Sequence, residues 1–136
     1  MIRGIDHIGL VTADLPGAAA ALSPFPLVPF YEGVAEPYRV ACQFWRHQDG
    51  DGVAVELVSP VGPDAAVAGH LARQGPGLHH IAFEVDDISA EVESLRRRGV
   101  VVIDPVPQRG ARPGMLVTFA HLGPATGLLV ELVQYR

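Results

Sequence analysis

The feature that most constrains the fold is an internal repeat, because a chain that carries one pattern twice folds into matching units. Residues 5–10 read Ile-Asp-His-Ile-Gly-Leu, and residues 78–83 read Leu-His-His-Ile-Ala-Phe. His7 therefore matches His80, 73 residues later. Each histidine is followed, after seven residues, by an aspartate and an aliphatic residue. Both halves are thus predicted to begin with the same short, β-rich strand.

The ends of the two halves match as well. Residues 52–58 read Gly-Val-Ala-Val-Glu-Leu-Val, and residues 127–133 read Gly-Leu-Leu-Val-Glu-Leu-Val. Glu56 matches Glu131, 75 residues later, which is close to the offset of the histidines. Two matched pairs at nearly one offset indicate a tandem duplication. A chain of 136 residues suits one compact domain, so we expect the two modules to share a single domain.

The clearest helix follows Asp87, whose side chain can accept bonds from the free amides of a helix start. Ile88, Val92 and Leu95 are spaced four and three residues apart, which gives one apolar stripe. Gly99 can close this helix in a left-handed conformation. The second half therefore contains an amphipathic helix directly after its first strand.

The matching helix of the first half is poorer. Asp14 can cap it and Pro16 suits its first turn, but Ser-Pro-Phe-Pro at residues 23–26 stops it after about two turns. A further helix is expected from Asp64 to Gln74, in the connection between the halves. The helix signals therefore differ between the two halves although the strand signals agree.

The remaining elements complete the pattern of each half. Strands are expected at 3–12, 27–31, 38–46, 52–59, 78–85, 100–103, 115–121 and 127–135. Prolines and glycines between residues 105 and 114 predict one long mobile loop. We expect module 1 over residues 1–60, a linker helix within 61–76 and module 2 over 77–136. Each module reads βαβββ, which places the chain in the α+β class.

Composition excludes several classes of function. The net charge of −5 argues against a nucleic-acid surface, which needs a basic face. Every one of the ten cationic residues is arginine, so no lysine is present for Schiff-base chemistry. Cys42 is the only cysteine, which excludes a disulfide framework within the chain and favours a buried, unreactive thiol.

No run approaches 18 consecutive apolar residues, so no membrane span is expected. The first residues pass from Met-Ile-Arg directly into a strand, without the apolar region of a secretion signal. We therefore expect a soluble, cytoplasmic protein.

The repeat brings together four side chains with metal-binding chemistry. His7, Glu56, His80 and Glu131 all lie in expected strands, and each one alone is more typical of an ordinary strand residue. If the halves pair about a pseudo-twofold axis, the two histidines and two glutamates converge, and their burial calls for a compensating partner. A divalent metal ion, Co, Mn, Ni, Zn or Fe, suits this donor set. His79 precedes the proposed ligand and should face the other way.

The second half is similar to a known family. Residues 77–88, Gly-Leu-His-His-Ile-Ala-Phe-Glu-Val-Asp-Asp-Ile, resemble the signature of the methylmalonyl-CoA epimerases within the vicinal oxygen chelate superfamily. Residues 99–105, 119–121 and 127–134 are similar to later segments of that family. The resemblance implies one open, cupped, eight-stranded mixed sheet and a homodimer. It also implies metal ligands at the positions of His7, Glu56, His80 and Glu131.

The resemblance implies an isomerase or epimerase that works through a metal-stabilised enolate, on a small oxygenated acid or an acyl thioester. Those epimerases carry a base glutamate on the strand that here spans residues 38–46, and no carboxylate is present there. The candidate catalytic residues are therefore Glu131, Gln43 and Glu36, of which Glu36 precedes that strand. Near His121 the family commonly has His-Pro-Lys, where this chain has His-Leu-Gly-Pro.

Other functions remain open at this stage. The same site would suit glyoxalase-like isomerisation or addition to an epoxide. A binding protein that sequesters an antibiotic or metabolite is an alternative from another class, although such members usually lack the metal ligands. Extradiol cleavage fits less well, because those enzymes are usually longer and use two histidines with one carboxylate.

Overall fold

The computed structural model describes all residues from 1 to 136. Its elements are, in order, β1 (Ile2–Val11), α1 (Leu15–Leu22), β2 (Leu27–Ala35), the 3-10 turn η1 (Glu36–Tyr38), β3 (Val40–His47), β4 (Ala54–Pro60), α2 (Ala68–Gln74), β5 (Gly77–Val85), α3 (Ile88–Arg97), β6 (Gln108–Arg109), β7 (Met115–His121) and β8 (Leu129–Tyr135). No helix among them is both long enough and apolar enough to cross a lipid bilayer. The expected α+β succession is confirmed.

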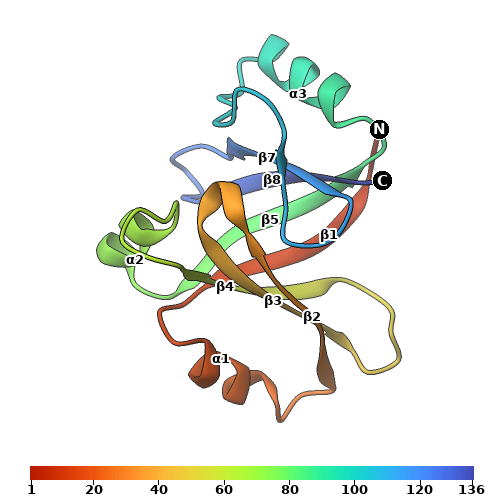
Figure 1. The fold of residues 1–136 in the computed structure, drawn as a ribbon. Helices are drawn as coiled ribbons and strands as arrows, with labels where there is room; N and C mark the ends of the chain where they lie inside the picture. The colour runs from red at the N-terminus through yellow and green to blue at the C-terminus, as the bar shows by residue number, and fades with distance from the viewer.

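All eight strands form one mixed sheet in the order β2-β3-β4-β1-β5-β8-β7-β6. The first strands of the two halves, β1 and β5, lie at its centre and run antiparallel, and each pairs in parallel with the last strand of its own half, β4 or β8. The sheet curls into an open half-barrel, with α1 and α3 at opposite ends of the molecule (Figure 1). The predicted cupped, mixed sheet is therefore confirmed.

The central pairing of β1 with β5 repeats itself under the 73-residue offset. His7 lies opposite Ala82, and Gly9 lies opposite His80. Exchanging each residue for its counterpart in the other half gives the same pairs again. This is the register that a pseudo-twofold axis between the two strands requires, and it brings the two histidines to one face of the sheet.

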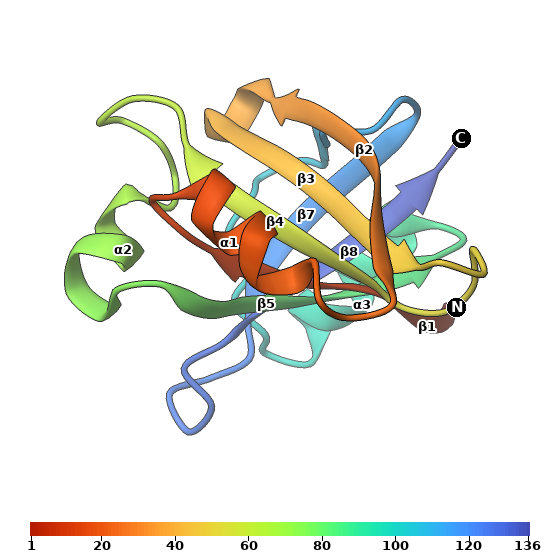
Figure 2. The same ribbon diagram turned by 90° about the horizontal axis from the view of Figure 1, so that it is seen from below.

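Apolar side chains fill two separate regions. The larger cluster lines the inside of the curved sheet and draws on both halves, with Val11, Phe44, Val58, Val117 and Val133 among its members. A smaller cluster packs α3 against the outer surface of the sheet, and in Figure 2 this helix lies behind β5. The inside of the sheet is therefore a largely apolar wall into which the functional side chains are set.

The predicted strand at 100–103 is wrong. Only one isolated bridge, between Val102 and Ala120, forms there, and the eighth strand is β6, inside the segment expected to be a loop. The cause is Asp104, whose Oδ2 accepts the backbone N–H of Phe119 at 2.7 Å. The Asp104 side chain thus takes the Phe119 N–H that the next backbone hydrogen bond of the ladder would need, so the pairing ends there.

Other expected boundaries shift, and the strand expected at 27–31 extends to Ala35. Asp64 does not cap a helix, because its carboxylate pairs with the Arg39 guanidinium at 3.1 Å, and α2 begins only at Ala68. The strand expected at 38–46 begins at Val40, because η1 takes up residues 36–38 and Arg39 adopts a left-handed conformation with φ of 53°. This turn places Tyr38 at the rim of the curved sheet.

Candidate metal centre

Strand register brings the four predicted ligands together. His7 pairs with Ala54 in the parallel β1–β4 ladder, so Glu56, two residues further along β4, lies diagonally beside it on the same face. His80 and Glu131 stand in the same relation on β5 and β8. Since β1 and β5 are neighbours, both pairs reach one point on the inside of the sheet.

At this point the four side chains face one another. His7 Nε2 lies 3.2 Å from His80 Nε2, 3.3 Å from Glu56 Oε1 and 3.4 Å from Glu131 Oε2. His80 Nε2 lies 3.1 Å and 2.9 Å from the same two carboxylate oxygens. All four residues are buried. The structure therefore builds one compact nitrogen and oxygen cluster within the sheet.

Phenylalanine rings flank the cluster symmetrically. Phe44 pairs with Glu56 across the β3–β4 ladder and presents its ring edge-to-face with His7, at 5.4 Å between centroids. Phe119 pairs with Glu131 across β7–β8 and stands in the same way against His80, also at 5.4 Å. These rings are 75 residues apart, like the glutamates, so the repeat itself could have identified them.

Without a metal, the cluster is held by shared protons. Burial lowers the pKa of His80, but the carboxylates of Glu131 and Glu56 outweigh it and raise the pKa to about 9. Burial likewise opposes the charged form of His7, and the same carboxylates raise its pKa well above the usual value. The carboxyl pKa values of Glu56 and Glu131, which burial alone would raise, are held low by the two imidazolium groups. Opposite charges thus stabilise one another inside an apolar wall.

The donor set fits a divalent metal ion. Metal–ligand bonds of about 2.0–2.2 Å place neighbouring donor atoms about 3.0–3.5 Å apart, and the five separations given above run from 2.9 to 3.4 Å. One donor atom from each of the four residues lies within 4.8 Å of the others. Two imidazoles and two carboxylates suit Mn, Fe, Co, Ni or Zn and leave coordination positions for a ligand.

Each imidazole is oriented through its other nitrogen. His7 Nδ1 lies 2.7 Å from Asp6 Oδ2, and Asp6 also accepts the Tyr135 hydroxyl at 2.9 Å. His80 Nδ1 lies 2.8 Å from His79 Nδ1. These contacts direct both Nε2 atoms toward the centre, as metal-ligating histidines require. The expectation that His79 faces the other way is wrong, because a bulge in the β1–β5 ladder leaves it between the paired residues Leu78 and His80, and its ring lines the pocket beside His80. Asp6, its counterpart 73 residues earlier, supports His7 in the matching way.

Gly9 makes room for the His80 ring. A Cβ atom at this position would lie 2.0 Å from His80 Cε1. Because His80 is buried and held by its neighbours, the ring could not move aside without leaving the cluster. Glycine is therefore required at the place where β1 passes under the second imidazole.

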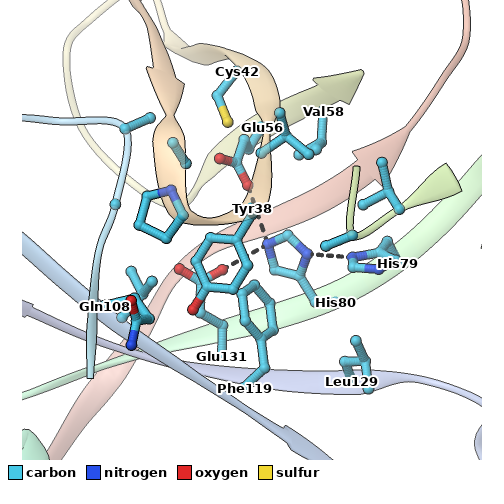
Figure 3. Close-up of a pocket in the computed structure, with 18 of the residues that line it drawn as sticks. Tyr38, Cys42, Glu56, Val58, His79, His80, Gln108, Phe119, Leu129 and Glu131 are labelled. Atoms are coloured by element: carbon cyan, nitrogen blue, oxygen red, sulfur yellow. Dashed lines mark hydrogen bonds and ion pairs between the residues drawn. The ribbon is translucent and has the colours of Figure 1, made fainter. Parts of the chain in front are cut away.

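The cluster opens into a pocket of about 360 Å³ that is mostly apolar. Glu56, His80 and Glu131 line its floor, and Tyr38, Cys42, His79 and Phe119 are among its walls (Figure 3). Its remaining polar groups are Asp104 and Gln108, on the segment between α3 and β7. A small molecule with oxygen atoms at one end and apolar groups at the other would suit this pocket.

Two side chains of the wall carry protons outside the cluster. The Tyr38 hydroxyl donates to Asp104 Oδ2 at 3.0 Å, and burial, reinforced by that carboxylate, raises the pKa of the phenol. Burial also raises the pKa of the Cys42 thiol, which agrees with the unreactive thiol expected from the sequence. Tyr38 is thus neutral and protonated at the pocket wall.

The other candidate catalytic residues lie elsewhere. The Gln43 side chain donates to Glu32 and accepts from Trp45 Nε1 at 2.7 Å, and it is absent from the pocket lining. Glu36 lines a neighbouring hollow together with Arg109 and Arg112. The inward residues of β3 are Val40, Cys42 and Phe44, so that strand presents no carboxylate to the pocket.

Comparison with known proteins agrees with this geometry. Residues 6–119 match the family described as the Glyoxalase/Bleomycin resistance protein/Dioxygenase superfamily. The chain is 36% identical to an ethylmalonyl-CoA/methylmalonyl-CoA epimerase of Cereibacter sphaeroides, over 98% of this chain and 99% of that one. It is 32% identical to the mitochondrial methylmalonyl-CoA epimerase of Homo sapiens, over 96% of this chain and 73% of that one.

A solved structure agrees as well. The Streptomyces coelicolor methylmalonyl-CoA epimerase in complex with 2-nitronate-propionyl-CoA superposes with a TM-score of 0.87, at 32% identity, and covers 99% of both chains. The superfamily match, the shared fold and these relatives lead to one assignment: the chain belongs to the glyoxalase/bleomycin resistance protein/dioxygenase superfamily and, within it, to the family of the methylmalonyl-CoA epimerases.

Proposed function

We propose that this chain is an epimerase that depends on a divalent metal, Co, Mn, Ni, Zn or Fe, and acts on a 2-substituted malonyl thioester of CoA. The observation that carries the proposal is the buried cluster of two imidazoles and two carboxylates at the floor of an apolar pocket. The relatives of this chain include enzymes named for epimerising methylmalonyl-CoA and ethylmalonyl-CoA. The carboxylate and thioester oxygens of such a substrate would face the cluster, and its alkyl group the apolar wall.

His7, Glu56, His80 and Glu131 would hold the metal. When bound, a divalent metal acts as a Lewis acid that stabilises negative charge developing on a carbonyl oxygen. Glu131 contacts both imidazoles through Oε2, so Oε1 is the oxygen we assign to take the proton from the α-carbon and to return it. The apolar wall excludes water from this step.

Epimerisation also needs a proton at the other face of the same carbon, and we assign this role to Tyr38. As the phenol oxygen takes the carbon-bound proton, its own O–H proton passes to Asp104 Oδ2, 3.0 Å away. One C–H bond and one O–H bond break, and two O–H bonds form. The reverse transfer returns the proton. Gln43 and Glu36 take no part in this scheme, because neither lines the pocket.

Exchange of the α-hydrogen with solvent tests the proposal directly. Protein loaded with Co²⁺ and incubated in D₂O with methylmalonyl-CoA should incorporate deuterium at the α-carbon, measured by mass spectrometry. Glu131→Gln should abolish incorporation into the stereoisomer whose α-hydrogen faces Glu131, since it removes the proton acceptor on that side. Tyr38→Phe should still permit exchange but should lose interconversion of the two stereoisomers. Wild-type protein that holds metal yet exchanges nothing would remove the epimerase assignment.

The lack of a carboxylate on the inward face of β3 favours a second candidate function, glyoxalase-like isomerisation. In that reaction one base removes a proton from one carbon and returns it to the next, so Glu131 alone would serve. Turnover of a glutathione hemithioacetal without exchange on methylmalonyl-CoA would select this alternative.

We also propose that the protein acts as a homodimer in the cytoplasm. Support for the dimer comes from the family resemblance and from exposed apolar side chains on the two central strands, Ile5 (45% exposed) and Leu78 (56% exposed). Analytical ultracentrifugation should give twice the chain mass, and a single-chain mass would contradict it. A fluorescent fusion in the source cell should fill the cytoplasm, and export of the fusion would contradict that location.

A further inference from the structure

A chain of three hydrogen bonds connects His7 to a distant loop. His7 Nδ1 lies 2.7 Å from Asp6 Oδ2, the Tyr135 hydroxyl donates to the same oxygen at 2.9 Å, and Arg112 Nη1 donates to the Tyr135 hydroxyl at 3.1 Å. Asp6 is on β1, Tyr135 ends β8, and Arg112 is in the segment between β6 and β7. Residues more than a hundred positions apart are thus tied to one imidazole.

Arg112 is held in place by aromatic rings rather than by an acid. Its guanidinium carbon lies 4.9 Å from the centre of the Tyr135 ring, 5.1 Å from that of Phe30 and 5.6 Å from that of Phe44. Phe44 is the ring that packs edge-to-face with His7. No carboxylate forms an ion pair with Arg112, so its charge remains available to the nearby Asp6 carboxylate.

The same loop borders the pocket. The pocket is lined directly by three residues just before Arg112, which are Gln108, Gly110 and Ala111. One end of this segment therefore faces the space for the substrate, and the other is bonded to the support of His7. Because a packed, hydrogen-bonded connection joins the two ends, a displacement of one end should also displace the other.

The second half has no equivalent of this connection. His80 Nδ1 contacts the neutral ring of His79, which in turn packs against His70 at 5.0 Å between ring centroids. No side chain of the loop between residues 105 and 114 hydrogen-bonds to that pair. Only His7 is therefore supported through this connection, and its loss should affect the cluster through His7 alone.

We propose that Arg112 and Tyr135 are positioning residues, which hold Asp6 against His7 and so couple the pocket-bordering loop to metal binding. The inference rests on the proposed metal centre. Fixing Asp6 fixes the His7 tautomer with Nδ1–H toward the carboxylate and Nε2 toward the cluster. By linkage, metal binding at His7 should in return order the loop.

The experiment measures Co²⁺ affinity by competition with a chromophoric chelator. Removing a partner that supports a metal-ligating histidine weakens metal binding about 10- to 100-fold, and we expect this range for Asp6→Asn. Tyr135→Phe and Arg112→Met should each weaken binding about tenfold by the same reasoning. Tyr31→Phe is the matched control, since the Tyr31 phenol lines the hollow beside Arg112 but makes no hydrogen bond to Asp6. Its dissociation constant should stay within about twofold of wild type.

Double variants separate positioning from general damage. If Tyr135 acts through Asp6, the double variant Asp6→Asn with Tyr135→Phe should bind Co²⁺ no more weakly than Asp6→Asn alone, whereas independent effects would multiply. Hydrogen exchange of the backbone amides of residues 109–116 supplies a second readout. Metal should protect these amides in wild type and not in Tyr135→Phe. Cooperative unfolding in the presence of chelator shows that a variant is folded. If Tyr135→Phe does not fold, Arg112→Met still tests the proposal.

The outcomes distinguish the two proposals. Wild-type protein that binds no Co²⁺ would overturn the metal centre and the coupling together. Wild-type binding with an unchanged dissociation constant in both Tyr135→Phe and Arg112→Met would overturn the coupling alone. Multiplicative losses in the double variant would likewise overturn it, while leaving the epimerase proposal intact.

Discussion

The two halves of this molecule present matching candidate ligands in different surroundings. His7 is backed by the Asp6 carboxylate, whereas His80 is backed by the imidazole of His79. The β-sheet around each is equivalent, down to the diagonal relation between histidine and glutamate. The two halves therefore agree in what strand register determines and differ in the side chains that support each imidazole.

The helices show the same divergence. In α3, Ile88 and Val92 are buried against the sheet, and Asp87 caps the first turn through Ala90 N at 3.1 Å. In α1 the cap is also present, but no residue of the helix is buried. The helix of the second half thus contributes a small core of its own, while that of the first half mainly connects strands.

The largest expected effect comes from exchanging the small residues under the two imidazoles. Gly9→Ala would place a Cβ 2.0 Å from His80 Cε1, so His80 should leave the cluster and Co²⁺ affinity should fall by more than about 100-fold. Ala82, opposite His7, is the counterpart. Ala82→Gly should cost about 1 kcal/mol of stability and leave the affinity within a few-fold. Wild-type affinity in Gly9→Ala would show that the two positions are equivalent after all.

Core truncations should separate the two helices. Ile88 is 2% exposed, and its replacement by alanine should lower the free energy of unfolding by about 2–5 kcal/mol. Leu15, the matching residue of α1, is only half-buried, so Leu15→Ala should cost less than about 1.5 kcal/mol. Urea unfolding in the presence of chelator measures both. Equal losses would mean that α1 is anchored as firmly as α3.

A third prediction concerns pH and the protonation of His80, the imidazole that is backed by His79. In chelator, His80 has its pKa raised from 6.5 to about 9. Protonated His80 therefore contributes to the free energy of unfolding fully below pH 6.5. This contribution, about 3 kcal/mol, is lost as the pH rises through about 9. With Co²⁺ the sign reverses, because metal ligands must lose their protons, and affinity should rise over the same window. Thermal unfolding from pH 6 to 9.5 with and without metal measures this. Stability in chelator that is constant across the window would contradict the raised pKa of His80.

Much of this arrangement is readable in the sequence, for a physical reason. Side chains alternate between faces along a strand, so the nearly equal offsets of His7/His80 and Glu56/Glu131 fix four positions once the halves pair. The match of Phe44 with Phe119 obeys the same rule. Features that depend on contacts outside the strand pattern could not be predicted from the sequence. Asp104 ends a ladder with its side chain, which turned the expected strand at 100–103 into a loop.

The supporting contacts are of this second kind. Tyr135 lies at the end of β8, where nothing in the local pattern shows that its hydroxyl reaches Asp6, 129 positions earlier. The same holds for Tyr38, which meets Asp104 only because η1 and the loop before β6 close over the pocket. Long-range polar contacts of this type depend on the rims of the sheet, where sequence periodicity is absent.

The smallest expected effect compares the two supports directly. Asp6→Asn removes a charged acceptor from His7 and should weaken Co²⁺ binding about 10- to 100-fold. His79→Phe removes a neutral acceptor from His80, and since neutral hydrogen bonds are about half as strong as charge-assisted ones, we expect about a fivefold loss. Burial and the neighbouring imidazoles lower the pKa of His79 to about 4, so it is neutral beside the proposed metal centre. His79→Gln restores an acceptor and should recover most of the affinity. If His79→Phe proved as costly as Asp6→Asn, charge would not be what distinguishes the two halves, and geometry alone would explain how each imidazole is held.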